Sequence, residues 1–125
     1  MILDTNALSA FVDGNDEIAN VLRFQPRAAI PVIVLGEFRY GVAASRHRKR
    51  YESWLSNNLA HFDILNVSEE TTLAYASVRS QLKRSGHPIP ANDAWIAALA
   101  VQHRLPILSR DRHFDEVDNI ERRDW

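Results

Sequence analysis

The sequence predicts an α/β protein with three layers, α/β/α, around a central, mainly parallel sheet of four to five strands. Short apolar runs alternate along the chain with longer segments whose apolar residues recur at helical spacing. Strands that alternate with helices require right-handed crossovers, which place helices on both faces of a parallel sheet. The 125 residues are enough for one core and too few for two, and no repeat or linker interrupts them. We therefore expect a single domain over residues 1–125.

The first half of the chain is predicted to form two strands and three helices. The strands are expected at residues 2–3 and 28–31, and the helices at residues 5–12, 16–24 and 32–44. The turn residues around Gly14 separate the first two helices, and Pro31 suits the start of the third. On that third helix, Ile33, Tyr40 and Ala44 recur at helical spacing and predict its apolar stripe.

The second half is predicted to add three helices and three strands, the last of them short. The helices are expected at residues 46–59, 69–84 and 93–103, and the strands at residues 62–67, 106–109 and 117–121. Ser68 can cap the middle helix and Gly86 can end it. The last helix, which begins at Asn92 or Asp93, is apolar nearly all round, so we expect it to be well buried.

The composition excludes several classes of protein. Fifteen Lys and Arg against sixteen Asp and Glu leave a formal charge of −1, which argues against a polybasic nucleic-acid binder. The absence of cysteine excludes disulfide scaffolds, thiolate zinc sites and cysteine nucleophiles. The four glycines form neither a Rossmann nor a P-loop pattern. No apolar run approaches the roughly 20 residues of a transmembrane helix and no signal peptide is evident, so we expect a cytoplasmic protein.

Four acidic residues lie where a parallel α/β sheet binds its ligands. Such sheets bind outside the carboxyl ends of their strands, at the point where the strand order reverses. Asp4 ends the first strand, Asp111 follows the fourth, and Asp93 opens the helix before it, while Glu37 points along the apolar stripe of the third helix. Each aspartate also has a structural interpretation: Asp4 and Asp93 as turn or cap residues, and Asp111 as a turn residue.

Glu37 is the hardest of the four to explain structurally. A buried carboxylate without a partner costs several kcal/mol or becomes protonated, and Arg39 projects from a different part of the helix. If the four acids converge, like charges about 4 Å apart repel by roughly 4 kcal/mol per pair at an effective dielectric near 20. Mg²⁺ or Mn²⁺ would remove this repulsion, because both prefer carboxylate and water oxygens. Such a site suits phosphodiester hydrolysis.

Four ordered motifs carry a resemblance to a known family. They are Ile2-Leu3-Asp4-Thr5-Asn6, Gly36-Glu37-Phe38-Arg39-Tyr40-Gly41, Pro90-Ala91-Asn92-Asp93-Ala94-Trp95-Ile96-Ala97-Ala98 and Leu108-Ser109-Arg110-Asp111-Arg112-His113-Phe114. In these motifs and their order the sequence resembles the PIN-domain family, most closely the small VapC-type ribonuclease toxins of toxin–antitoxin pairs. The resemblance spans nearly the whole chain and implies a PIN-like, Rossmann-like fold.

The resemblance also implies a site. Asp4, Glu37, Asp93 and Asp111 would surround Mg²⁺ or Mn²⁺, with Asp4 and Asp93 as the firmest ligands and the other two bound directly or through water. Small polar residues would line the pocket and orient ligands, namely Thr5 or Asn6 and Ser109. A further acid near the fourth motif, Asp115, is either part of the site or outside it. Metal-activated water would cleave RNA to leave a 5′-phosphate and a 3′-hydroxyl.

The partners implied are an RNA substrate, a cognate VapB-type antitoxin and a second copy of the chain. DNA would be contacted only through the antitoxin, and no membrane is involved. Two alternatives stay open. One is a PIN-like protein that binds RNA or a partner without cleavage; the other is an aspartate-nucleophile phosphatase, although Asn6 stands where that chemistry needs a second acid.

Basic residues and histidines complete the candidates. The run of residues 46–50 is either a solvated helix start or an RNA backbone contact. The predicted RNA contacts are Arg46, Arg48, Lys49, Arg50, Arg110 and Arg112. The five histidines show no metal-ligand spacing, and we interpret them as structural or surface residues; they are His47, His61, His87, His103 and His113. With the four acids set aside, the rest of the chain carries +3, so RNA binding is compatible with its charge.

Overall fold

A five-stranded parallel sheet with the order β3-β2-β1-β4-β5 lies at the centre of the computed structural model, which describes residues 1–125. The strands are β1 (Ile2–Leu3), β2 (Ala29–Pro31), β3 (Asp63–Leu65), β4 (Ile107–Leu108) and β5 (Arg122–Arg123). The helices are α1 (Thr5–Val12), α2 (Asp16–Arg23), α3 (Val32–Ala43), α4 (Arg48–Asn58), α5 (Glu69–Ser85) and α6 (Ala91–His103), with short 3₁₀ helices η1 (Leu59–His61) and η2 (Arg112–Glu116). None of these helices is long and apolar enough to cross a bilayer.

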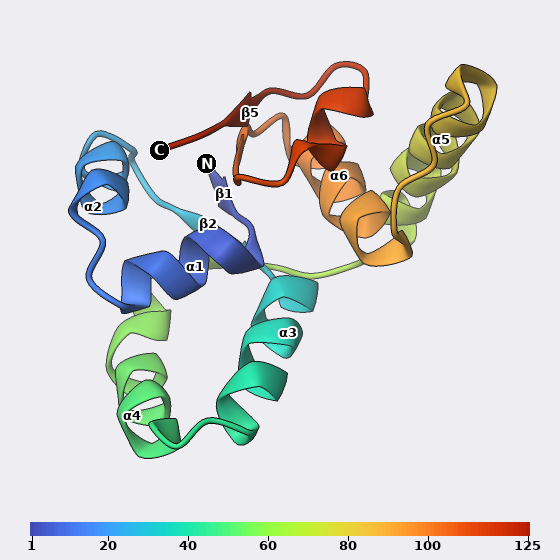
Figure 1. Ribbon diagram of the computed structural model, residues 1–125. Helices are drawn as coiled ribbons and strands as arrows, with labels where there is room; N and C mark the ends of the chain where they lie inside the picture. The colour runs from blue at the N-terminus through green and yellow to red at the C-terminus, as the bar shows by residue number, and fades with distance from the viewer.

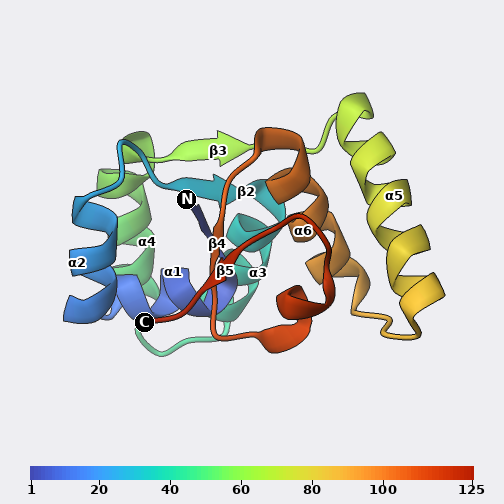
Figure 2. The ribbon, with the colours of Figure 1, turned by 90° about the horizontal axis from the view of Figure 1, so that it is seen from above.

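The helices form two layers, as the sequence predicts. Strands β1, β2 and β3 follow one another in one direction across the sheet, whereas β4 lies on the other side of β1. Right-handed crossovers therefore put α1 to α4 on one face and α5 with α6 on the other; Figures 1 and 2 show these two groups on opposite sides. The α/β/α prediction is confirmed, and every strand pair is parallel.

The strand order reverses between β1 and β4, which pair directly. Ile2 is in register with Ile107, and Leu3 with Leu108. Both strands are buried completely, so their apolar side chains hold the two carboxyl ends together. The residues that follow them, Asp4 and Ser109, therefore emerge side by side at the crevice where parallel sheets bind ligands.

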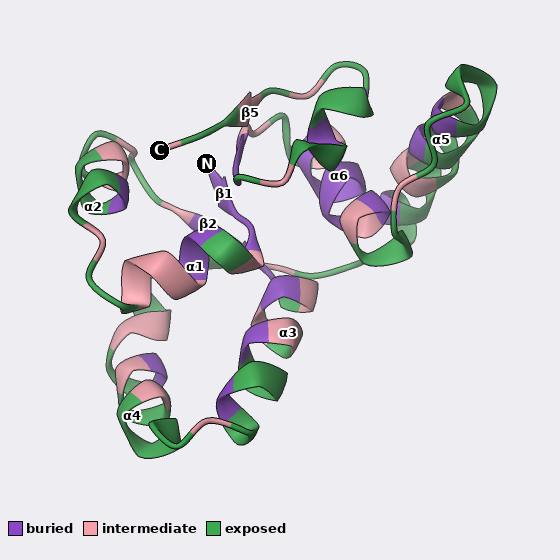
Figure 3. Ribbon diagram, in the orientation of Figure 1, coloured by how far each residue is buried: buried purple, intermediate pink, exposed green.

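Helix α6 is the most buried helix of the molecule. Its residues from Ile96 to Ala100 are all buried, together with Ala94, which confirms the prediction from its apolar composition. Figure 3 shows this buried surface on α6, whereas α5, which packs outside it, is largely exposed. The first turn of α6 is consequently fixed against the core beside the carboxyl ends of the strands.

The buried face of α3 differs from the predicted stripe. Val34, Phe38 and Val42 are buried, whereas Tyr40 is 85% exposed. The prediction of a stripe through Ile33, Tyr40 and Ala44 is wrong, because α3 packs against α1, α4 and α6 with a face rotated away from those residues. Sequence spacing alone could not choose between two overlapping apolar sets on one helix.

Several element boundaries also differ from the predictions. Helix α4 begins at Arg48, because a turn precedes it in which the main-chain N–H of His47 donates to Ser45 Oγ at 3.0 Å. Helix α6 begins at Ala91, immediately after Pro90. The predicted strand at residues 117–121 is wrong: β5 forms at Arg122–Arg123, where the N–H of Ser109 donates to the carbonyl of Arg123 at 3.0 Å.

Candidate active site

Asp4 lies buried at the carboxyl end of β1, with 4% of the residue exposed. Its Oδ2 accepts hydrogen bonds from Ser109 Oγ at 2.7 Å and from Asn6 Nδ2 at 3.1 Å. The side chain does not cap α1. Burial raises the pKa of the Asp4 carboxyl, the bond from Ser109 opposes this, and the negative charges of Asp111 and Glu37 raise the pKa further. Asp4 is therefore a buried acid held in place by neutral donors.

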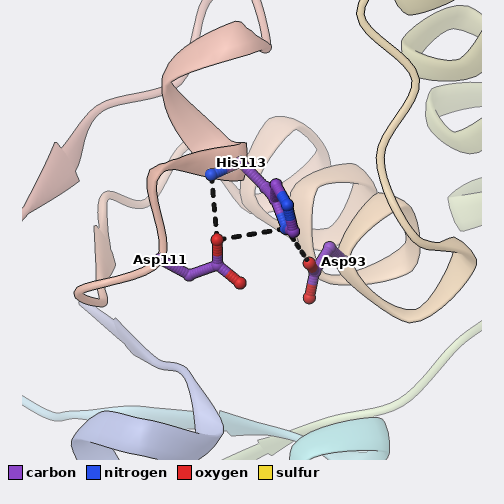
Figure 4. A group of neighbouring side chains, drawn as sticks. All are labelled: Asp93, Asp111 and His113. Atoms are coloured by element: carbon purple, nitrogen blue, oxygen red, sulfur yellow. Dashed lines mark hydrogen bonds and ion pairs between the residues drawn. The ribbon is translucent and has the colours of Figure 1, made fainter.

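Asp93 and Asp111 meet at His113 (Figure 4). The imidazole Nδ1 of His113 lies 2.9 Å from Asp93 Oδ2 and 3.1 Å from Asp111 Oδ1. The main-chain N–H of His113 also donates to Asp111 Oδ1 at 2.9 Å, so Asp111 caps η2. Asp93 is the third residue of α6 and not its cap, which is Pro90.

The charges of this group affect one another. Burial raises the pKa of Asp93, and the nearby carboxylates of Asp111 and Asp4 add to the rise. The hydrogen bond to Asp93 raises the pKa of His113. His113 is exposed, as expected of a surface residue, but its half-exposed ring also bridges two of the four predicted site acids, a contact that the sequence spacing did not indicate.

Glu37 projects from α3 toward the segments that carry Asp4 and Asp93. Thr5 Oγ1 donates to Glu37 Oε2 at 2.6 Å, and Asn92 Nδ2 donates to Glu37 Oε1 at 3.0 Å. No ion pair joins it to Arg39, as the sequence spacing predicts. Because Thr5 follows Asp4 and Asn92 precedes Asp93, these two bonds tie Glu37 to the two aspartate-bearing segments.

Ser109 connects the first and fourth motifs. Its hydroxyl donates to Asp4 and also accepts the main-chain N–H of Asp111 at 2.9 Å. Asn6 reinforces the same junction, because its Oδ1 accepts the main-chain N–H of Arg110 at 3.1 Å. The structure thus brings all four acids, and the predicted polar residues Thr5, Asn6 and Ser109, to one edge of the sheet.

The donor set suits a hard divalent cation. Asp93, Asp111 and His113 each offer one ligand atom, and these atoms all lie within 4.8 Å of one another. No lysine or arginine pairs with any of the four acids; only His113 does. Carboxylates gathered around the buried Asp4, without a paired lysine or arginine, are the oxygen-rich surroundings that Mg²⁺ and Mn²⁺ prefer.

Other predicted residues lie outside this cluster. Both carboxylate oxygens of Asp115 accept bonds from Arg122, at 2.7 and 3.0 Å, so Asp115 is engaged in an ion pair. The Arg110 guanidinium lies over the Trp125 ring at 4.4 Å and pairs with Asp124 at 3.5 Å. Arg112 is exposed on η2, and the basic residues from Arg46 to Arg50 are exposed in the turn before α4 and in its first residues.

Sequence reasoning assigned no role to Asn92 or His113. Asn92 stands next to Asp93, but nothing in the spacing indicates that its amide reaches Glu37, 55 residues away along the chain. His113 follows Asp111 by two residues, and the short helix η2 turns its ring back toward Asp93. The only feature of the sequence that indicates a site role for His113 is its position two residues after Asp111.

Comparison with known proteins places this fold and its motifs in one family. The model of the PIN domain matches residues 1–120. Ribonuclease VapC2 of Rickettsia felis is 28% identical, and the match covers 99% of this chain and 96% of that protein. Ribonuclease VapC5 of Mycobacterium tuberculosis is 30% identical over 94% of this chain and 87% of that protein.

Comparison with solved structures supports the same assignment of the fold. The crystal structure of VapBC2 from Rickettsia felis, bound to a DNA fragment from its promoter, superposes with a TM-score of 0.90 at 27% identity, covering 99% of this chain and 97% of the matched one. The family-model match over residues 1–120 therefore shows that the chain belongs to the PIN-domain family.

Proposed function

We propose that this protein is a metal-dependent endoribonuclease and the toxin of a toxin–antitoxin pair. The observation that carries the proposal is the cluster of four carboxylates at the β1–β4 crevice, which no lysine or arginine neutralises. Two relatives with this fold are named ribonucleases, which supports RNA as the substrate.

The residues that would hold Mg²⁺ or Mn²⁺ are Asp4 and Asp93, with Glu37 and Asp111 binding directly or through water. When bound, such an ion supplies positive charge beside the scissile phosphate and lowers the pKa of water. The chain contributes the positioning. Ser109 and Asn6 orient Asp4, while Thr5 and Asn92 hold Glu37 toward the same space. Water would attack the phosphorus, and the bond between the phosphorus and the 3′ oxygen would break. The products would then carry a 5′-phosphate and a 3′-hydroxyl.

The proposed partners follow from a relative. The Rickettsia felis protein forms a VapBC2 complex that is bound to promoter DNA. We infer a cognate VapB-type antitoxin for this chain, which would supply the DNA contact, and a homodimer of the toxin. The RNA substrate makes the cytoplasm the place of action.

The test compares Asp93→Asn with Asp118→Asn, the same change at an exposed aspartate outside the cluster. Single-stranded RNA is incubated with each protein while Mg²⁺ or Mn²⁺ is titrated, and metal binding is measured by calorimetry. We expect wild type and Asp118→Asn to cleave RNA and bind metal, and Asp93→Asn to lose both.

Three results would contradict the proposal. The first is undiminished cleavage by Asp93→Asn, and the second is tight RNA binding by wild type with no cleavage under any divalent cation, which would favour a binding protein. The third is a phosphoryl group trapped on Asp4, which would indicate a phosphatase.

A further inference from the structure

A groove leads away from the acidic cluster between α1, α3 and α4. It has a volume of about 290 Å³, and Thr5 and Glu37 line it, so it borders the predicted metal site at Glu37. Its other lining residues are Ser9, Asp13, Phe38, Gly41, Val42, Ser45 and Tyr51. Hydroxyls of Thr5 and Ser9 from α1, of Tyr51 from α4 and of Ser45 from the turn after α3 thus face this space.

The groove continues into a second hollow made by the turn between α3 and α4. Residues 45–50, here called the basic turn, line this hollow, and Ser45 lines both cavities. Figure 1 shows α3 and α4 descending from α1 and joined at their lower ends by this turn. With a helical rise of about 1.5 Å per residue, the six residues from Glu37 to the end of α3 at Ala43 rise roughly 9 Å, and Ser45 follows two residues later.

The basic turn carries more positive charge than its own surroundings neutralise. Arg48 pairs with Glu52 at 3.7 Å, and Arg50 with Asp13 at 3.8 Å. Arg46 and Lys49 are exposed and have no acidic partner. These cations stand at the amino end of α4, where the helix dipole is already positive, so they do not serve to stabilise the helix.

The acid within the groove is already neutralised. Asp13 Oδ1 accepts a hydrogen bond from Tyr51 Oη at 2.8 Å and faces the Arg50 guanidinium. The groove therefore runs from a site for a divalent cation, past hydroxyl groups, to two unpaired cations. An anionic chain is favoured over an amphipathic protein helix, which would need a mainly apolar wall.

We propose that the RNA strand follows this groove and places a backbone phosphate, distant from the scissile one, on Arg46 and Lys49. The inference rests on the proposed ribonuclease function and adds the direction in which the substrate leaves the site. Phosphate contacts of this kind bind without reading sequence and depend strongly on salt. Arg46 and Lys49 are thus substrate-positioning residues.

The experiment uses the double variant Arg46→Ala/Lys49→Ala and, as a matched control, Lys83→Ala/Arg84→Ala. The control removes two exposed cations without acidic partners from α5, on the opposite side of the sheet. Binding of a fluorescent single-stranded RNA of about 12 nucleotides, within the size of single-strand sites, is measured in the Asp93→Asn background at several salt concentrations.

We expect the Arg46/Lys49 variant to bind about tenfold more weakly, with the slope of log K against log salt reduced by about 0.7 for each lost contact. The control should bind as its parent does. In the cleaving protein the same double variant should raise KM and leave kcat unchanged. A dinucleotide, which has a single phosphate, should be cleaved equally by wild type and variant.

An unchanged RNA affinity and salt slope, or an equal loss of affinity in the control variant, would overturn the proposed path of the RNA strand. So would loss of antitoxin binding with RNA binding intact, which would assign the turn to a protein partner. The ribonuclease proposal fails on a separate result, the absence of cleavage by wild type. The two failures are distinguishable because the binding assay uses protein that is not required to cleave.

Discussion

At the level of single residues, Asp4 is subject to opposing demands. It must be ionised to bind a cation, yet burial and two neighbouring carboxylates raise its pKa. The hydrogen bonds from Ser109 and Asn6 hold its Oδ2 in position. Residues that build such a site are expected to reduce the stability of the metal-free protein, because like charges gather there.

Replacing Asp4 by Asn should abolish metal binding and cleavage but stabilise the metal-free protein. The folded-state pKa of Asp4 lies above the unfolded one, so its ionisation opposes folding as the pH rises through that range and above it. The Asn carbonyl can still accept the bonds from Ser109 and Asn6. Thermal unfolding in EDTA at pH 7 and pH 4 should show a gain in Tm that is larger at pH 7.

A lower Tm for Asp4→Asn at pH 7 would contradict this account of the charge at Asp4. Added Mg²⁺ or Mn²⁺ provides the complementary measurement. The cation should raise the Tm of wild type, because it binds the folded state, and leave that of Asp4→Asn unchanged.

At the level of elements, helix ends decide local stability. Ser68 caps the start of helix α5, where its main-chain N–H donates to Thr71 Oγ1 at 3.0 Å, and Gly86 caps the end of this helix with φ of 73°. Arg104 caps the end of helix α6 and adopts the same left-handed conformation with φ of 55°. Glycine adopts this conformation without strain, whereas a residue with a Cβ pays about 1–2 kcal/mol.

The two helix ends predict opposite effects. Gly86→Ala should lower the free energy of unfolding by about 1 kcal/mol, because alanine is strained at that φ. Arg104→Gly should raise it by up to about 1 kcal/mol, since strain relief exceeds the entropy that glycine adds to the unfolded chain. Urea unfolding measures the free energy of unfolding of both variants. Equal signs for the two variants would show that side-chain contacts, and not backbone conformation, dominate at one of these ends.

At the level of the whole molecule, the C-terminal strand braces the site. Arg122 is 13% exposed, forms two bonds to Asp115, and donates to the main-chain carbonyl of Ser109 at 3.0 Å. The same Ser109 holds Asp4 through its hydroxyl. Strand β5 therefore supports, through Arg122, the segment that links β4 to the acidic cluster.

Arg122→Ala should lower the free energy of unfolding by about 1–2 kcal/mol, because it leaves the Ser109 carbonyl and Asp115 without their donor. Metal affinity should also fall, since the segment after β4 loses the hydrogen bond by which Arg122 holds it in position. Arg123→Ala is the matched control: Arg123 is exposed and pairs only with Glu121, so its loss should cost less than about 1 kcal/mol. Urea unfolding and metal calorimetry measure both effects, and equal losses for the two variants would refute the bracing role.

Much of the fold was predictable because it depends on local signals. Strand β1 and helix α1 lie at the predicted residues, and the apolar composition of α6 identified it as buried. The candidate acids were predictable for a related reason: parallel strands present their carboxyl ends at one edge, so residues just after β1 and β4 must be neighbours.

The sequence by itself determined the alternation of strands and helices and the presence of acids where strands end. Only the tertiary structure decided the buried face of α3, the position of β5, and the partners of individual side chains. Glu37 meets Asn92, and His113 meets Asp93, through contacts between residues far apart in the chain. Spacing along a chain specifies which residues share a face of one element, whereas the packing of elements against one another specifies which faces meet.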